Sequence, residues 1–234
     1  LHSVGHSFPT RRSSDLEYAK QLNFRADIIH SNDWHTAMIP LYIKANYKFD
    51  EFWSKTKNVF EIHNLAYQGV WFEDILDFAN MRKDIVFNEW GCEHYGRVNW
   101  MKGAINYSDR VIAVSPTYAR EILTGEYGEG MDYTLRGHTD KLRGIVNGID
   151  YDVFNPKTDK TLIKNYDVNS LAKKEECKKK ILEYFGLKYN PERPLIALIS
   201  RLVDQKGLDL IRQVENDLRN LEADFIFLGS GDRK

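Results

Sequence analysis

Short apolar runs recur along the chain from Glu17 onward, and most of them end in a polar residue or a glycine. Such runs are typical of parallel strands that helices cover on both faces. We expect strands at Asp27–His30, Asn58–His63, Arg110–Ser115, Arg143–Asn147, Leu195–Ser200 and Asp224–Leu228. Helical patterns lie between them at His35–Tyr47, Arg97–Tyr107, Pro116–Leu123 and Gly207–Leu221. This alternation predicts an α/β fold with a doubly wound parallel sheet.

Charge and composition exclude several classes of partner. The 234 residues include 33 Lys and Arg against 34 Asp and Glu, which gives a formal net charge of -1. A nucleic-acid-binding domain would carry a strong basic excess, and an anionic membrane would attract a polybasic segment. The longest apolar run, residues 194–200, is too short to span a bilayer. We therefore expect neither nucleic acid nor a membrane as a partner.

Residues 1–16 differ from the rest of the chain. This segment, LHSVGHSFPTRRSSDL, shows no helical or strand period and is rich in Ser, His and Arg. Its composition is compatible with an organelle transit peptide, but the segment more closely resembles a translated sequencing adapter. We therefore interpret residues 1–16 as an addition that is not native, and we leave them out of the expected fold.

Polar side chains follow the first strand, at the edge where open parallel sheets bind their ligands. Asp33, Trp34 and His35 supply a carboxylate, an aromatic ring and an imidazole, which together suit a hydroxyl-rich ligand such as a sugar. The alternative is that Asp33 only caps the next helix. A metal site at His30, Asp33 and His35 has weaker support, because their spacing matches no strong metal signature.

The second and fourth strands also lead into candidate residues. A dense set of polar and aromatic side chains follows the second strand directly: His63, Asn64, Tyr67 and Gln68. This density favours a binding site over a single, partly buried structural histidine. The fourth strand leads into Asn147 and Gly148, a pair that by itself indicates only a turn.

The fifth strand is followed by two cations, Arg201 and Lys206, with Gly207 next to the second. Arg presents a planar fork to phosphate oxygens and Lys a compact charge, so a diphosphate could engage both. The alternative is a pair of surface cations, one of them balanced by Asp204. No Walker-type glycine-lysine loop is present in the sequence, which leaves an ATPase without support.

Several of these segments resemble the bacterial glycogen synthases and plant starch synthases. In chain order they are HSNDWHTAMIPLYIK, VFEIHNLAYQG, GRVNWMKGAINYSDRVIAVSPTYAREI, IVNGID with FNP, and SRLVDQKGLDLI. HNLAYQG is quite specific to this family, whereas the Arg-x-x-x-x-Lys-Gly element is shared more widely among retaining glycosyltransferases. The resemblance covers nearly everything from Glu17 to Gly231.

The resemblance implies an α/β fold of GT-B type, with two Rossmann-like domains facing a cleft. Residues 17–144 would be the C-terminal part of the first domain, and residues 145–234 the first part of the second. Both domains would be incomplete in this chain, because the family's Lys-Thr-Gly-Gly loop and its later motifs have no counterpart here. We therefore expect this chain by itself to be inactive.

The activity implied by the resemblance is transfer of glucose from ADP-glucose to the non-reducing end of an α-1,4-glucan. The anomeric configuration would be retained, and neither a catalytic metal nor a cofactor would be needed. The resemblance assigns catalytic roles to His63, Arg201, Lys206 and Asp33. It assigns substrate binding to His35, Asn64, Tyr67, Gln68, Asn147 and Gly148.

For two of these roles the resemblance also implies how the residues would act chemically. The backbone carbonyl of His63 would lie near the anomeric carbon, where positive charge develops. Arg201 and Lys206 would neutralise the departing diphosphate, and such stabilisation of growing charge is usually a large catalytic term.

Three alternatives stay open. The first is a related transferase that uses UDP-glucose or another acceptor, and the second is a non-catalytic glucan-binding remnant. The third, a nucleotide-binding α/β regulator, rests on the fold alone. The two cysteines are too few for a disulfide framework, and we expect a bacterial cytoplasmic protein rather than a plastid one.

Overall fold

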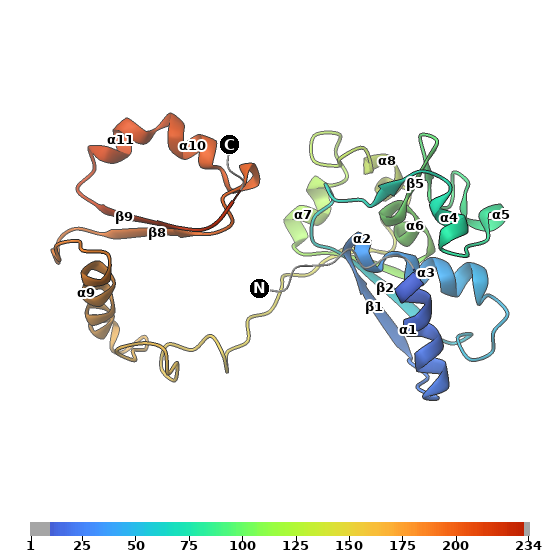
Figure 1. Cartoon of the computed structure of the whole chain (residues 1–234), viewed down its shortest axis with the longest axis horizontal. Helices are drawn as coiled ribbons and strands as arrows, with labels where there is room; N and C mark the ends of the chain where they lie inside the picture. Colours follow the sequence, from blue (N-terminus) through green and yellow to red (C-terminus); the bar gives the residue numbers. More distant parts are fainter. Residues whose placement is uncertain (1–9, 232–234) are drawn as a thin grey trace. The chain divides into compact units, whose positions relative to one another are not determined.

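The structure is a computed structural model that describes residues 10–231. The chain divides into two compact units, the first ending at Gly148 and the second beginning at Ile149 (Figure 1). This boundary lies slightly later than the one expected between residues 144 and 145. Each unit contains a parallel sheet of its own.

The main sheet of the first unit has four parallel strands in the order β1-β2-β6-β7. They are β1 (Ile28–Asn32), β2 (Lys57–Ile62), β6 (Arg110–Ala113) and β7 (Leu142–Gly144). The first four predicted strands are thereby confirmed, with shifted ends. The widest difference is at β7, which ends at Gly144 rather than Asn147. Ile145 and Val146 continue the apolar pattern but are 55% and 68% exposed, so the pattern outlasts the strand.

Three successive helical segments, rather than the one helix expected at His35–Tyr47, connect β1 to β2. They are α2 (Asp33–Thr36), α3 (Met38–Leu41) and the π-helical η1 (Tyr42–Asn46). The wider turn of η1 is closed by a hydrogen bond of 2.9 Å from the Tyr47 N–H to the Tyr42 carbonyl. The sequence therefore predicted helical structure here correctly, but it did not indicate the division into three segments or the π-helical turn.

Two of the predicted helices pack in the first unit with side-chain caps. Helix α7 (Pro116–Glu121) begins as predicted, since the Ser115 hydroxyl accepts a hydrogen bond from the Tyr118 N–H at 2.9 Å. Helix α6 (Trp100–Tyr107) begins later than expected, and Asn99 caps it by accepting from the Lys102 N–H at 2.9 Å.

Six short elements of the first unit were not predicted, and one of them is a strand where the first residues of a helix were expected. The strands are β3 (Val70–Trp71), β4 (Glu93–His94) and β5 (Arg97–Asn99), and the helices are α4 (Ile75–Phe78), α5 (Lys83–Val86) and α8 (Asp132–Arg136). The three strands form an antiparallel sheet in the order β3-β5-β4. Elements of two to five residues are too short to show a period, which is why the sequence did not indicate them.

The core of the first unit lies around β2, α3 and α6. Its largest fully buried side chains include Tyr42, Phe60, Met101 and Trp100. Helix α3 packs directly against α6, and α6 also contacts β2 and α2. This packing fixes the positions of the strand ends.

Helix α1 (Thr10–Gln21) revises the expectation that residues 1–16 lie outside the fold. Leu16 is 4% exposed and belongs to the core, and Ala19 packs against that core three positions later, on the same helix face. The Tyr47 hydroxyl also donates to Glu17 Oε1 at 2.6 Å. The absence of a visible period was misleading, because one buried leucine and a neighbouring alanine on the same face are enough to hold this helix against the core. Residues 1–9 lie outside the described residues.

The second unit is a small α/β arrangement. Its strands β8 (Leu195–Ile199) and β9 (Asp224–Leu228) are parallel neighbours, as predicted. The helical elements are η2 (Leu171–Lys173), α9 (Lys174–Tyr184), η3 (Asp204–Lys206), α10 (Leu208–Gln213) and α11 (Glu215–Arg219). The helix expected at Gly207–Leu221 is thus divided, at Val214, where φ is -107°. Across residues 10–231, the structure holds no helix of the length and apolarity that a membrane span requires.

The seating of α1 can be tested by mutation. Leu16→Ala should lower the free energy of unfolding by roughly 2–5 kcal/mol, because it leaves a cavity in a packed core. Tyr18→Ala, at a position that is 62% exposed on the same helix, should change it by less than about 0.5 kcal/mol. Urea denaturation of both variants measures the difference. Equally small effects would show that α1 does not pack on the core.

Candidate functional site

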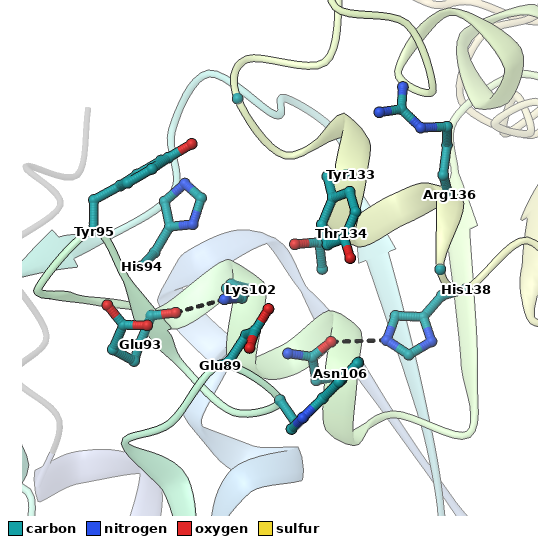
Figure 2. A pocket seen from close by; sticks show the side chains of 13 residues that line it. Glu89, Glu93, His94, Tyr95, Lys102, Asn106, Tyr133, Thr134, Arg136 and His138 are labelled. Atoms are coloured by element: carbon teal, nitrogen blue, oxygen red, sulfur yellow. Dashed lines mark hydrogen bonds between the residues drawn. The ribbon is translucent and has the colours of Figure 1, made fainter.

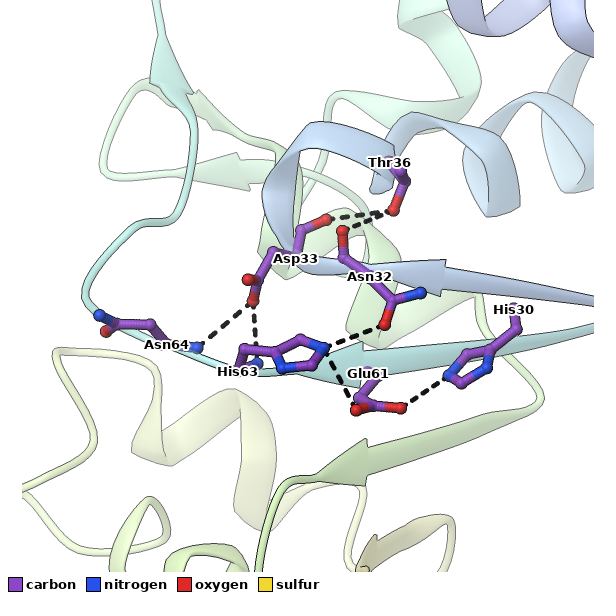
Figure 3. Close-up of polar contacts among 7 residues, drawn as sticks. All are labelled: His30, Asn32, Asp33, Thr36, Glu61, His63 and Asn64. Atoms are coloured by element: carbon purple, nitrogen blue, oxygen red, sulfur yellow. Dashed lines mark hydrogen bonds and ion pairs between the residues drawn. The ribbon is translucent and has the colours of Figure 1, made fainter. Parts of the chain in front are cut away.

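The carboxyl ends of β1 and β2 bring Asp33 and His63 together (Figure 3). The two strands are parallel neighbours with Asn32 opposite Glu61, so the residues that follow them meet at one edge of the sheet. Asp33 Oδ1 accepts hydrogen bonds from the backbone N–H of His63 at 2.9 Å and of Asn64 at 3.3 Å. The carboxylate therefore joins two strand ends, which is a different role from the helix cap considered as the alternative.

These two hydrogen bonds also set the direction of the His63 carbonyl. In a trans peptide, the carbonyl oxygen of one residue and the N–H of the next point in opposite directions. Because the Asn64 N–H points to Asp33, the His63 carbonyl points away from it. Asp33 itself has a φ of +53°, a left-handed conformation that Asp tolerates better than most residues.

The imidazole of His63 is held by two acceptors. Its Nε2 lies 3.0 Å from Asn32 Oδ1 and 3.2 Å from Glu61 Oε1. The other carboxylate oxygen of Glu61 lies 2.8 Å from His30 Nε2 (Figure 3). Since both neighbours of Nε2 are acceptors, the proton of the neutral ring resides on Nε2. The Nδ1 lone pair is then available to accept a hydrogen bond.

The loop at residues 63–69 is held in place by close contacts with α2 and α6. A Cβ on Gly69 would lie 2.6 Å from Cε3 of Trp34, and Gly69 has a φ of +65°, so only glycine fits. The carbonyls of Gln68 and Gly69 accept hydrogen bonds from the N–H groups of Met101 at 3.1 Å and Trp100 at 3.2 Å. The first turn of α6 thus uses its otherwise unpaired donors to anchor this loop.

The Gln68 side chain connects three segments of the first unit. Its Oε1 accepts from Asn99 Nδ2 at 2.6 Å, and its Nε2 donates to the Glu129 carbonyl at 2.8 Å. Gln68 was predicted to bind substrate, and in this structure its amide is engaged by the protein itself. The Asn64 side chain likewise accepts from the Ala66 N–H at 3.0 Å.

The other predicted residues of this edge are more open. Tyr67 is 53% exposed, and the exposed His35 lies beside Trp34 with ring centroids 4.1 Å apart. The Leu65 N–H donates to the Tyr118 hydroxyl at 3.0 Å, and burial raises the pKa of that hydroxyl. Tyr118 therefore stays protonated and acts as a fixed support under the loop.

Arg201 and Lys206 lie in the second unit, Arg201 in the loop after β8 and Lys206 at the end of η3, and both are exposed. The Leu202 N–H donates to the Ser230 carbonyl at 2.8 Å, which ties this loop to the one after β9. A Cβ on Gly229 would lie 2.0 Å from the Ser200 carbonyl oxygen, so the two loops approach as closely as backbones can. The two cations are thus carried by a braced turn.

Asn147 and Gly148 lie beyond the end of β7, where the first unit ends, and both are exposed. The structure therefore joins Asp33, His63 and Asn64 by hydrogen bonds, and His35, Tyr67 and Gln68 lie in the segments that follow β1 and β2. Arg201 and Lys206 belong to the second unit. Within residues 10–231, no three His, Cys, Asp or Glu side chains are grouped so that they could hold a metal ion.

Sequence reasoning missed Glu61 and Asn32, which hold the His63 ring. Glu61 is a charged residue between the apolar Phe60 and Ile62, and that was the available signal. Its partners could not be named, because the pairing of β1 with β2 fixes which side chains are neighbours.

A family model described as the starch synthase catalytic domain matches residues 12–137. The chain belongs to this family. It is 45% identical over 219 residues to a glycogen synthase of Thermosipho melanesiensis, covering 94% of this chain and 45% of that protein. It is 47% identical over 222 residues to a glycogen synthase of Thermotoga maritima, covering 95% and 46%. The chain spans about half the length of these curated relatives.

A solved structure from the same family shares the fold of this chain. The catalytic domain of starch synthase IV from Arabidopsis thaliana, bound to ADP and acarbose, matches with a TM-score of 0.91 and 35% identity. The match covers 97% of this chain and 46% of that one. The predicted α/β fold class of GT-B glycosyltransferases is therefore confirmed for this starch synthase family member.

The role of Asp33 gives a prediction that needs no substrate. Asp33→Ala should lower the free energy of unfolding by about 2–4 kcal/mol, because two N–H groups lose a charged acceptor and Ala is strained at positive φ. Asp33→Asn keeps the Oδ1 acceptor and tolerates this φ, so it should cost less than about 1.5 kcal/mol. Chemical denaturation compares the variants, and equal losses would refute the clamp.

Proposed function

We propose that the complete protein carrying this chain transfers glucose from ADP-glucose to the non-reducing end of an α-1,4-glucan, with retention of configuration. The observation that supports this most is the cluster at the ends of β1 and β2, where Asp33 clamps the His63 and Asn64 peptides. Membership of the starch synthase family and the ADP and acarbose bound to the Arabidopsis protein support a nucleotide-sugar donor and a glucan acceptor.

His63 would act on the donor sugar in two ways. Its carbonyl, directed away from Asp33, offers a partial negative charge to the anomeric carbon as positive charge develops there. Its Nδ1 accepts a hydrogen bond from a sugar hydroxyl, because Asn32 and Glu61 keep the ring proton on Nε2. Both groups are in place before substrate binds, so little reorganisation accompanies the reaction.

Arg201 and Lys206 would stabilise the leaving diphosphate. As the glycosidic C–O bond of the donor breaks, negative charge grows on the diphosphate oxygens, and fixed cations lower the energy of that state. The bracing of their loop by Leu202 and Gly229 limits its motion. His35, Tyr67, Asn147 and Gly148 remain proposed contacts of the sugars.

Related proposals concern the donor, the acceptor and the compartment. Comparing ADP-glucose with UDP-glucose in one assay decides the donor. Glucan binding without any transfer would instead favour a binding protein.

We also propose a bacterial cytoplasmic location, since curated relatives are bacterial glycogen synthases. We expect the 234-residue chain alone to lack transfer activity.

Substitution of the two cations tests the diphosphate role. In the complete protein, Arg201→Ala and Lys206→Ala should each lower kcat by about 100-fold, because each removes a cation aimed at transition-state charge. The conservative variants Arg201→Lys and Lys206→Arg should keep part of the activity. Lys188→Ala and Arg212→Ala, at exposed cations of the same unit, are the matched controls and should be unaffected. Unchanged turnover in both test variants would remove this assignment.

A further inference from the structure

One face of the main sheet carries two imidazoles on a single carboxylate (Figure 3). Asn32 lies opposite Glu61 in the register of β1 with β2. His30 and His63 are each two residues from that pair along the chain, so strand alternation puts all four on one face. Glu61 Oε2 lies 2.8 Å from His30 Nε2, and Glu61 Oε1 lies 3.2 Å from His63 Nε2. The Glu61 side chain is 13% exposed, so most of it is shielded from water.

No lysine or arginine that the structure describes forms an ion pair with this carboxylate. By register, Arg110 of β6 and Arg143 of β7 lie on the same face of the sheet. The Arg110 guanidinium donates to the Asp109 carbonyl at 2.9 Å, and that of Arg143 donates to the Leu142 carbonyl at 2.7 Å. Glu61 is therefore shared between the two histidine rings.

A carboxylate and an amide constrain a histidine ring differently. An ionised carboxylate has no proton to give, so a neutral ring that faces it carries its own proton on the facing nitrogen. An amide can turn either its oxygen or its NH₂ group to the ring, so it fixes the tautomer only when its own orientation is fixed. His63 faces both kinds of group, since Asn32 Oδ1 also lies 3.0 Å from its Nε2.

His138 shows how an anchored amide holds a ring (Figure 2). Its Nε2 lies 2.7 Å from Asn106 Oδ1, and Asn106 Nδ2 donates to the Gly91 carbonyl at 2.7 Å. Turning this amide would break the second bond, so its oxygen keeps the proton of His138 on Nε2. Burial lowers the pKa of His138, and the charge of Lys141 adds to the effect, which keeps the ring neutral.

The amide of Asn32 lacks a comparable anchor among the described residues. Its NH₂ group makes no hydrogen bond with any of them, and the residue is exposed. The Thr36 hydroxyl donates to the backbone carbonyl of Asn32 at 2.7 Å, which leaves the side chain free to rotate. Asn32 could therefore serve either tautomer of His63, whereas Glu61 serves only one.

We propose that Glu61 is a positioning residue that keeps the proton of His63 on Nε2 and the lone pair on Nδ1, and that His30 holds the carboxylate in place. This inference rests on the proposed function, in which Nδ1 faces the donor sugar. A lone pair there favours the positive charge that develops at the anomeric carbon, whereas a proton on Nδ1 would oppose it. Glu61 therefore acts on turnover more than on donor binding.

Imidazole nitrogen NMR shows the tautomer directly and needs no transfer reaction. The complete protein is labelled with ¹⁵N-histidine and studied in alkaline buffer, where imidazoles are neutral. His30→Gln, His63→Gln and His138→Gln assign the signals. In the unsubstituted protein, His30 and His63 should both carry their proton on Nε2. A proton on Nδ1 of His63 would overturn the proposal.

Two variants separate the carboxylate from the amide. Glu61→Gln offers an NH₂ group in place of an acceptor, so part of the His63 population should carry its proton on Nδ1. Asn32→Ala should leave that proton on Nε2. His138 should keep its tautomer in both variants, which shows that the first unit is folded. Full retention of the Nε2 proton of His63 in Glu61→Gln would refute the role of Glu61.

Steady-state kinetics of the complete protein test the consequence for transfer. Glu61→Gln should lower kcat by about 10-fold and change KM for ADP-glucose by less than about twofold, because the lost interaction acts on transition-state charge. Glu51→Gln, at an exposed carboxylate before β2, is the matched control and should leave both constants unchanged. A higher KM at unchanged kcat would assign Glu61 to donor binding and contradict the proposal.

This proposal and the proposed function can fail separately. If Glu61→Gln shifts the His63 tautomer but the complete protein transfers no glucose, the proposed function fails and control of the tautomer by Glu61 stands. If the complete protein transfers glucose and the tautomer is the same in Glu61→Gln, the inference about Glu61 fails alone.

Discussion

The carboxylate of Asp33 is the group on which the candidate site depends. It accepts hydrogen bonds from two successive backbone N–H groups of the neighbouring strand end, and thereby fixes the peptide between His63 and Asn64. Water competes for such bonds, so the clamp works only where the partners are held in place. The parallel register of β1 with β2 provides that, because it puts Asn32 opposite Glu61 and brings the residues after both strands to one edge.

The remaining structure of the first unit keeps that edge rigid. The loop that starts at His63 is bonded to the first turn of α6 through two of its carbonyls, and Gly69 allows close contact with Trp34. Gln68 adds side-chain bonds to Asn99 and to the Glu129 carbonyl. A site that is ordered before substrate arrives needs little reorganisation during the reaction, which is the main physical advantage of this arrangement.

The sequence predicted the six parallel strands correctly, because six short apolar runs between helical patterns allow few other folds. It also indicated Asp33 and His63, since polar residues that follow parallel strands meet at one edge. It did not indicate Glu61 as a partner of His63, because that contact depends on strand register. The strands β3, β4 and β5 have two or three residues each and show no period. Helix α1 was missed because its contacts come chiefly from Leu16 and Ala19.

Glucosyl transfer with retention is the central claim, and the chemistry of the product tests it most directly. The complete protein is incubated with ADP-glucose and maltoheptaose while proton NMR follows the anomeric signals. We predict that ADP-glucose disappears and that a new α-1,4-linked glucose appears at the non-reducing end at the same rate. A β-configured product, or consumption of ADP-glucose without a new glycosidic linkage, would contradict the claim.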